Sequence, residues 1–123
     1  MSARTMKKPL SPVLRVKAEA ERRIAAGIDI GGGVMFRCDP ESVGRIQGLL
    51  LAAQRLEERQ EAVSISFKTA SGTTVTITSA AQAGAVFDRA SAHLARILAR
   101  SAALQDRVAG GDVLDPANDA LWA

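Results

Sequence analysis

The chain holds one cysteine, Cys38, and one histidine, His93, which could in principle pair as a nucleophile and its general base. Asp39 directly follows the cysteine, and a neighbouring carboxylate raises the pKa of a thiol, so the reactive thiolate is disfavoured. The sequence places no cluster of basic residues near Cys38 to oppose this effect. We therefore expect a buried structural cysteine, a hydrogen-bonded structural histidine and no catalytic residues.

Residues 29–33 have the sequence Asp-Ile-Gly-Gly-Gly and are similar to the acidic glycine loop of sugar kinases and actin-like ATPases. Backbone amides of such a loop can cradle a phosphate group. Those folds need several hundred residues and further acidic motifs, which this chain of 123 residues lacks. Glycine also supplies the positive φ of a tight turn, so we expect a hairpin here and no cofactor.

Other metal and cofactor sites are disfavoured by composition. A single cysteine and a single histidine exclude a disulfide framework, a zinc site built on cysteines and any site that needs two imidazoles. The chain has neither a lysine-containing phosphate loop nor a dinucleotide fingerprint. No apolar run approaches the roughly 20 residues of a membrane span, and residues 1–9 lack the apolar segment of a secretory signal. We expect no membrane partner.

Charge is unevenly distributed along the chain. Residues 1–23 hold seven basic and two acidic residues, a net charge of +5, whereas residues 109–123 hold three aspartates and no basic residue. A basic head and an acidic tail could attract each other between neighbouring subunits; both could equally be solvated chain ends. The basic segment has no aromatic residue for base stacking and no recognition motif, which argues against a nucleic-acid partner.

The pattern of apolar residues predicts an α+β fold. In chain order, it predicts a basic extended arm over residues 1–14, a helix over 14–26, a hairpin over 28–36, a helix over 40–61, a hairpin over 63–78 and a helix that opens at 79–82 and ends at Gly110. The prediction is a small single domain over residues 15–110, in which β-hairpins pack on two long helices. An acidic docking tail over residues 111–123 follows it.

The helix over residues 40–61 has a strong start, with Asp39 as cap and Pro40 at the first helical position. Gly44 and Gly48 lie inside it, one turn apart, and each costs about 1 kcal/mol relative to alanine. The simplest compensation is the close approach of another backbone along that side of the helix, although neither glycine need have a role.

The hairpin over residues 63–78 alternates apolar residues with serine, threonine and lysine, so one face is expected to be buried. Two strands are marginal alone, and the ribbon must pack on a helix or join a larger sheet. The tail carries four apolar residues between aspartates, one proline and one asparagine, and is expected to dock through them. The candidate interface residues are Arg4, Lys7, Lys8, Phe67, Lys68, Asp112, Asp115, Leu121 and Trp122.

The order of these motifs resembles a known family. A glycine hairpin is followed by Phe-Arg-Cys-Asp at 36–39, by Ser-Val-Gly-Arg-Ile-Gln-Gly at 42–48, by the ribbon at 67–78 and by a long alanine-rich helix with His93. This pattern, over about residues 20–110, resembles an uncharacterised domain of tailed-phage and prophage proteins, often encoded beside tail-fibre genes. That family usually has tryptophan just before the ribbon lysine, where this chain has Phe67. The basic arm and the Trp122 tail lie outside the resemblance.

The resemblance implies a virion or virion-assembly protein without an active site. The expected function is a structural component of a tailed phage particle, associated with the tail or tail fibres, that assembles through its hairpin, long helix and termini. Two alternatives are a capsid decoration (cement) protein and an assembly chaperone for tail or fibre proteins. The expected partners are further copies of the chain, as a homo-oligomer, and other phage structural proteins. The expected location is the virion, and the host cytoplasm during assembly.

Overall fold

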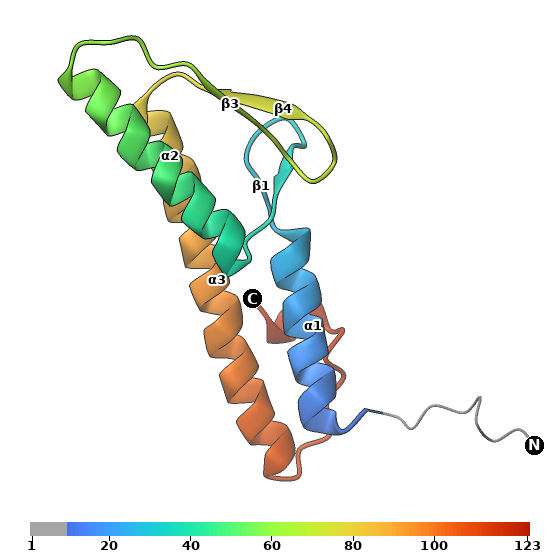
Figure 1. Cartoon of the computed structure of the whole chain (residues 1–123). Coiled ribbons are helices and arrows are strands. Elements are labelled where there is room, and N and C mark those ends of the chain that lie inside the picture. The colour runs from blue at the N-terminus through green and yellow to red at the C-terminus, as the bar shows by residue number, and fades with distance from the viewer. Residues whose placement is uncertain (1–9) are drawn as a thin grey trace, which may run out of the picture.

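The computed structural model describes residues 10–123 and has an α+β fold, as predicted (Figure 1). Two small antiparallel hairpins accompany three helices, and the C-terminal tail ends in a short 3-10 helix. The elements are α1 (Pro12–Ala26), β1 (Ile28–Asp29), β2 (Met35–Phe36), α2 (Pro40–Glu58), β3 (Ile65–Lys68), β4 (Thr74–Ile77), α3 (Ala80–Ala109) and η2 (Asp119–Leu121). Arg4, Lys7 and Lys8, the basic residues of the predicted arm, lie outside the described residues.

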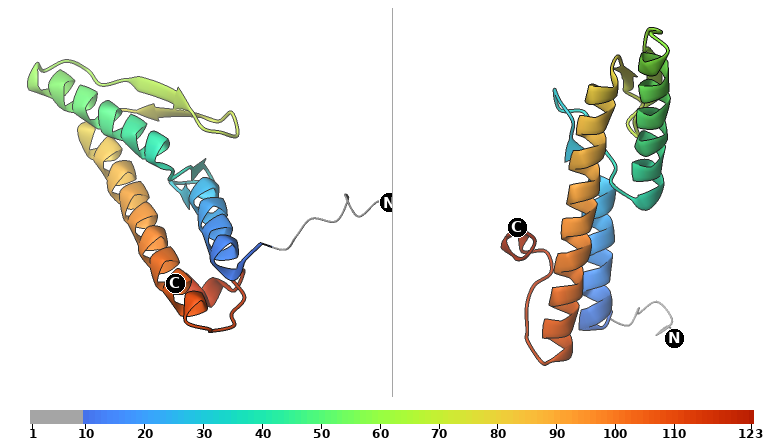
Figure 2. Two further views of the ribbon diagram at one scale, coloured as in Figure 1. Left: turned by 60° about the horizontal axis from the view of Figure 1, so that its bottom comes forward. Right: turned by 90° about the vertical axis from the view of Figure 1, so that its left-hand side faces the viewer.

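The long helix α3 is the spine of an elongated molecule (Figures 1 and 2). Helix α1 packs beside its C-terminal half and helix α2 beside its N-terminal half. Each contact has its own apolar cluster. The first joins Val16, Ala20, Ile24, Ile97, Leu104 and Trp122, and the second joins Phe36, Cys38, Ile46, Val86 and Ala90. Leu94 packs against both clusters and makes the core continuous along α3.

The predicted starts of α2 and α3 are confirmed. The Asp39 side chain accepts a hydrogen bond from the Ser42 amide at 3.4 Å, and Pro40 is the first helical residue. At α3, Ser79 Oγ accepts from the Gln82 amide at 3.0 Å, while Gln82 Oε1 accepts from the Thr78 amide at 2.8 Å. Each cap satisfies amides that have no partner inside the helix.

Three expectations need correction. Helix α1 begins at Pro12, so the predicted extended arm does not reach residue 14; Ser11 caps the helix and its Oγ accepts from the Leu14 amide at 3.2 Å. Helix α2 ends at Glu58, three residues early, because Gln60 takes a φ of +58° that a helix cannot continue. No backbone approaches Gly44 or Gly48, since a Cβ built at either would have no atom within 4 Å.

The ribbon of β3 and β4 follows its predicted pattern. Ile65 pairs with Ile77 and Phe67 with Val75, and these side chains lie on the more buried face. Three residues, 70–72, form the turn, in which Gly72 has a φ of +87°. The Thr69 amide donates to the Thr73 carbonyl at 2.9 Å and closes the ladder. A three-residue turn with glycine in the left-handed position is a common hairpin connection.

Candidate functional site

Cys38 is buried, as predicted. Its side chain is fully buried in the apolar cluster between α2 and α3, and its Sγ donates to the Phe36 carbonyl at 3.5 Å. Burial raises the pKa of the Cys38 thiol, the Ile28 backbone opposes this shift, and the Asp39 carboxylate raises the pKa further. Both effects keep the sulfur as a neutral thiol, which is a weak nucleophile.

Only one of the two ring nitrogens of His93 has a hydrogen-bond partner in the described part of the chain. Its Nδ1 accepts from the Arg96 guanidinium at 3.0 Å, which selects the neutral ring with the proton on Nε2. Within residues 10–123, Nε2 is buried and has no hydrogen-bond partner. Burial lowers the pKa of His93, and the Arg96 charge lowers it further, while the Arg23 backbone carbonyl opposes the shift.

This environment predicts a pH dependence of stability. The unfolded chain binds a proton on His93 near pH 6.5, whereas the lowered pKa means that the folded chain resists protonation. The free energy of unfolding is therefore expected to fall as the pH drops from 6.5 towards 5. Glu19 and Asp39, whose carboxyl pKa values are lowered by hydrogen bonds from Arg22 and Ser42, lose their contribution only at lower pH.

Urea titrations at pH 7.5, 6.5 and 5.5 test this prediction, with His93→Gln as the matched variant. Glutamine keeps a polar side chain and does not titrate, so its stability should change less between pH 6.5 and 5.5 than that of the wild type. An equal loss in both proteins would assign the effect to other groups.

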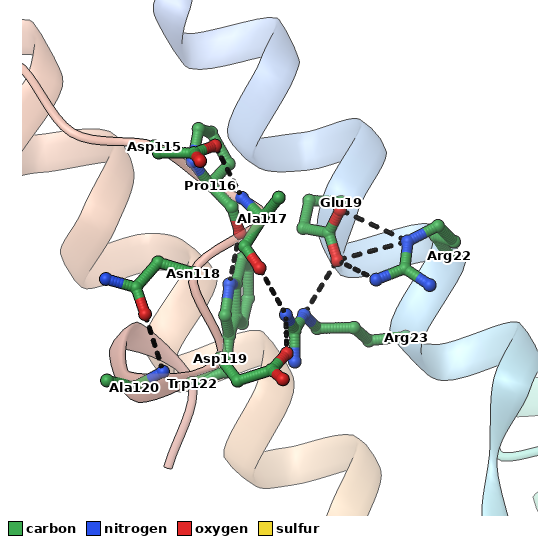
Figure 3. A network of polar contacts seen from close by, with 10 residues as sticks. All are labelled: Glu19, Arg22, Arg23, Asp115, Pro116, Ala117, Asn118, Asp119, Ala120 and Trp122. Atoms are coloured by element: carbon green, nitrogen blue, oxygen red, sulfur yellow. Dashed lines mark hydrogen bonds and ion pairs between the residues drawn. The ribbon is translucent and has the colours of Figure 1, made fainter.

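The C-terminal tail docks on the chain's own helices (Figure 3). Trp122 is 4% exposed, packs in the cluster between α1 and α3, and donates from Nε1 to the Pro116 carbonyl at 2.8 Å. The Arg23 guanidinium lies 5.3 Å from the centre of the Trp122 ring. Arg23 also bonds Glu19 at 2.8 Å and Asp119 at 2.6 Å, which ties α1 to the tail.

The other predicted tail residues also make contacts within the chain. Asp112 pairs with Arg107 at 3.0 Å, just beyond the end of α3. Asp115 Oδ1 accepts from the Ala117 amide at 3.0 Å and holds the turn before Trp122. Leu121 packs against the cluster that contains Trp122. The contacts of the tail leave little of the Trp122 surface exposed to a partner. An interface role for Trp122 and the three residues named above stays a prediction.

A groove of about 510 Å³ lies between α2 and the two hairpins. Its apolar walls come from all three elements. They are Met35 and Phe36 of β2, Ile46 and Leu49 of α2, and Phe67 of β3. Phe36 and Phe67 meet edge to face, with ring centres 6.1 Å apart and an angle of 84° between the planes. Met35 stays 45% exposed, so the groove presents apolar surface to its surroundings.

Two of the interface residues predicted from sequence line this groove. Phe67 forms part of the wall, and Lys68 lies at the rim, where its Nζ donates to Thr74 Oγ1 at 3.0 Å. The rim also holds two ion pairs that the sequence analysis missed, Arg37 with Asp39 at 3.5 Å and Arg45 with Glu41 at 2.7 Å. The four-residue spacing of Glu41 and Arg45 on a helix is the signal that could have found the second pair.

The family model described as "Domain of unknown function (DUF4376)" matches residues 11–121. The chain belongs to this family. No curated protein and no solved structure gives a significant match to the sequence. The DUF4376 match is wider than the resemblance over residues 20–110, because it starts at the cap of α1 and includes most of the tail. The docked tail up to Leu121 is therefore part of the family domain.

Two further properties describe the DUF4376 domain over residues 10–123. No helix in this range is both long enough and apolar enough to span a membrane. The same range contains no group of three or more histidine, cysteine, aspartate or glutamate side chains close enough to share a metal ion.

Proposed function

We propose that this protein is a non-enzymatic structural component of a tailed-phage virion, associated with the tail or tail fibres. The resemblance of residues 36–48 and 67–78 to a domain of tailed-phage and prophage proteins supports the phage context. The membership in DUF4376 is compatible with this proposal and adds no activity of its own.

The observation that carries the assembly role is the position of Phe67 and Lys68. The sequence predicts both as interface residues, and both line the groove beside the ribbon. Large apolar side chains also remain uncovered on the helices, with Leu51 54% and Leu98 53% exposed. Single exposed leucines are common on protein surfaces, so the groove, whose apolar walls are partly uncovered, is the stronger sign of a surface that binds another protein.

The elongated shape suits the same role. Helix α3 has 30 residues, which corresponds to about 45 Å at 1.5 Å per residue. Helices α1 and α2 stiffen its two halves, and the docked tail holds α1 in place. Such a rod can present the groove, which lies beside the N-terminal half of α3, to a neighbouring subunit, which is either another copy of the chain or a different phage structural protein.

Mass spectrometry on purified particles of a phage that encodes this chain tests the proposal. Heads and tails are separated first, and a known protein of each fraction serves as the control for cross-contamination. The protein is expected in the tail fraction. Its presence in heads at high copy number would instead assign it to capsid decoration. Its absence from both fractions, with abundance in the infected-cell lysate, would assign it to an assembly chaperone.

A further inference from the structure

We propose that the groove binds an extended segment of a partner protein, which adds a strand to the free edge of β3 and carries alternating apolar and acidic residues. This inference rests on the proposed assembly role and names the chemistry of the partner at the same groove. Strand addition is a common way for a domain to bind a peptide, because backbone hydrogen bonds provide affinity and alternate side chains provide specificity.

The register of the ribbon shows which backbone groups are free. The bond from the Thr69 amide to the Thr73 carbonyl fixes the alternation of the ladder, in which every second residue points its backbone groups away from the partner strand. Ser66 and Lys68 are such residues on β3. Within residues 10–123, no hydrogen bond is made by their backbone amides or carbonyls.

Side chains of α3 contact a backbone carbonyl on each of two other strand edges. On β4, the outward carbonyl of Thr76 accepts from Gln82 Nε2 at 3.3 Å. On β1, the carbonyl of Asp29 accepts from the Arg89 guanidinium at 2.5 Å. Gln82 and Arg89 both belong to α3, so the long helix contacts the two edges nearest to it. Since an open edge invites pairing with another chain, proteins usually cover such edges. Within residues 10–123, no side chain makes such a contact with the outward groups of Ser66 and Lys68 on β3, whose four residues offer a longer open edge than the two residues of β2.

The groove lies on the β3 side of the ribbon. The ribbon residues that line it, 67–70, belong to the end of β3 and the turn, and the β4 residues take no part. A strand added here would place one set of side chains beside Phe67, Ile46 and Leu49, and the alternate set beside Ser66 and Lys68. The first set must be apolar, and the second faces solvent.

The charges at the rim of the groove indicate which residues the partner strand carries beside Ser66 and Lys68. Arg37 and Arg45 are paired with Asp39 and Glu41. Lys68 is the lining cation without an ion pair in the described part of the chain. A carboxylate opposite Lys68 completes a cross-strand pair of opposite charge. The occupant is therefore an extended segment with an acidic residue at that position.

Two segments of the chain itself fit this requirement poorly. Residues 1–9 carry three basic residues and no acidic residue, so they would repel Lys68. A second copy that paired through its own β3 would bring residues 63–70, which also contain no carboxylate. A different protein with an acidic, apolar strand is the better match.

Peptide binding to the purified full chain tests the proposal. The probe is a fluorescein-labelled octapeptide pool with valine, isoleucine or phenylalanine at odd positions and glutamate or threonine at even positions. A second pool replaces glutamate with lysine. Fluorescence polarisation should show binding of the acidic pool and roughly tenfold weaker binding of the basic pool, which corresponds to about 1.4 kcal/mol.

Two matched proline variants test the edge itself. Ser66→Pro removes the outward amide of β3, and Thr76→Pro removes the outward amide of its direct partner on β4. Neither change breaks a ladder bond, and both lose the hydroxyl contact of 3.0 Å between the two side chains. Ser66→Pro is expected to weaken binding of the acidic pool roughly tenfold, while Thr76→Pro leaves it within about twofold. Thermal unfolding monitors the fold of both variants.

Lys68→Glu provides a test without a backbone change, since Lys68 is exposed. It should reverse the preference, so that the lysine pool binds more tightly than the glutamate pool. Failure of both pools to bind, an equal effect of the two prolines, or an unchanged preference in Lys68→Glu would each overturn the proposal. Concentration-dependent dimerisation abolished by Ser66→Pro would assign the edge to a second copy and likewise overturn it. These outcomes are independent of where mass spectrometry finds the protein in the particle, so the two proposals fail separately.

Discussion

Replacing Trp122 with alanine is expected to lower the free energy of unfolding by about 3 to 5 kcal/mol, the usual cost of removing a large aromatic side chain from a core. The indole is 4% exposed and packs with residues from both α1 and α3. Its removal also frees the Pro116 carbonyl, which accepts the Nε1 hydrogen bond, and withdraws the ring that lies beside Arg23. The tail should then detach, and α1 should lose part of its cover.

Urea unfolding of Trp122→Ala, with two comparison variants, measures this effect. Trp122→Phe keeps an aromatic ring and loses the Nε1 donor, so an intermediate loss is expected, of which about 1 kcal/mol belongs to the hydrogen bond. Val113→Ala changes a fully exposed residue of the same tail and should stay within about 0.5 kcal/mol of the wild type. Wild-type stability in Trp122→Ala would contradict the docked tail.

The same variant separates two roles of the tail. The sequence predicts that its apolar residues dock, and the structure places the docking within the chain. If Trp122 instead joined subunits, Trp122→Ala would reduce self-association while the stability of the monomer stayed unchanged. Sedimentation velocity alongside the urea titration distinguishes these cases, because a residue of the chain's own core must affect the monomer.

Local features of the fold were predictable from sequence because their causes lie within a few residues. The cap at Asp39 with Pro40 after it, the cap at Ser79, and the turn that ends at Gly72 each depend on side chains close in the chain. The start of α1 had an equally local signal, a serine followed by proline at residues 11–12. Proline also favours extended segments, and this general tendency competes with the capping signal.

Long-range features could not be predicted in the same way. Arg23 bonds Asp119, 96 positions further along the chain, and no spacing rule connects two such residues. The groove depends on the relative placement of α2, β2 and β3, so the sequence could suggest Phe67 and Lys68 but not the walls around them. The open side of Gly44 and Gly48 is likewise a tertiary property, since a helical glycine can mark either a close contact or an empty face.

Replacing Gly27 with alanine is the second change for which a large effect is expected. Gly27 ends α1 with a φ of +73°, and its amide donates to the Arg23 carbonyl at 3.1 Å. A Cβ built here would lie 1.8 Å from the Phe36 carbonyl oxygen and 2.6 Å from the carbonyl carbon. The obstacle is backbone, which cannot rotate away as a side chain can. Alanine must therefore displace β2 as well as adopt a φ that it disfavours.

The expected loss is about 3 kcal/mol or more in the free energy of unfolding, from backbone strain and the displacement together. Gly44→Ala is the matched control, because it adds the same methyl group to open space in a helix and should stabilise the protein by about 0.5 to 1 kcal/mol. Thermal unfolding of the two variants measures both the expected loss of stability in Gly27→Ala and the expected gain in Gly44→Ala. Displacement of β2 would also move Phe36, which packs on Phe67 in the groove wall. A folded Gly27→Ala protein should therefore bind the acidic peptide pool more weakly, whereas wild-type stability and binding would show that β2 is not held against the end of α1.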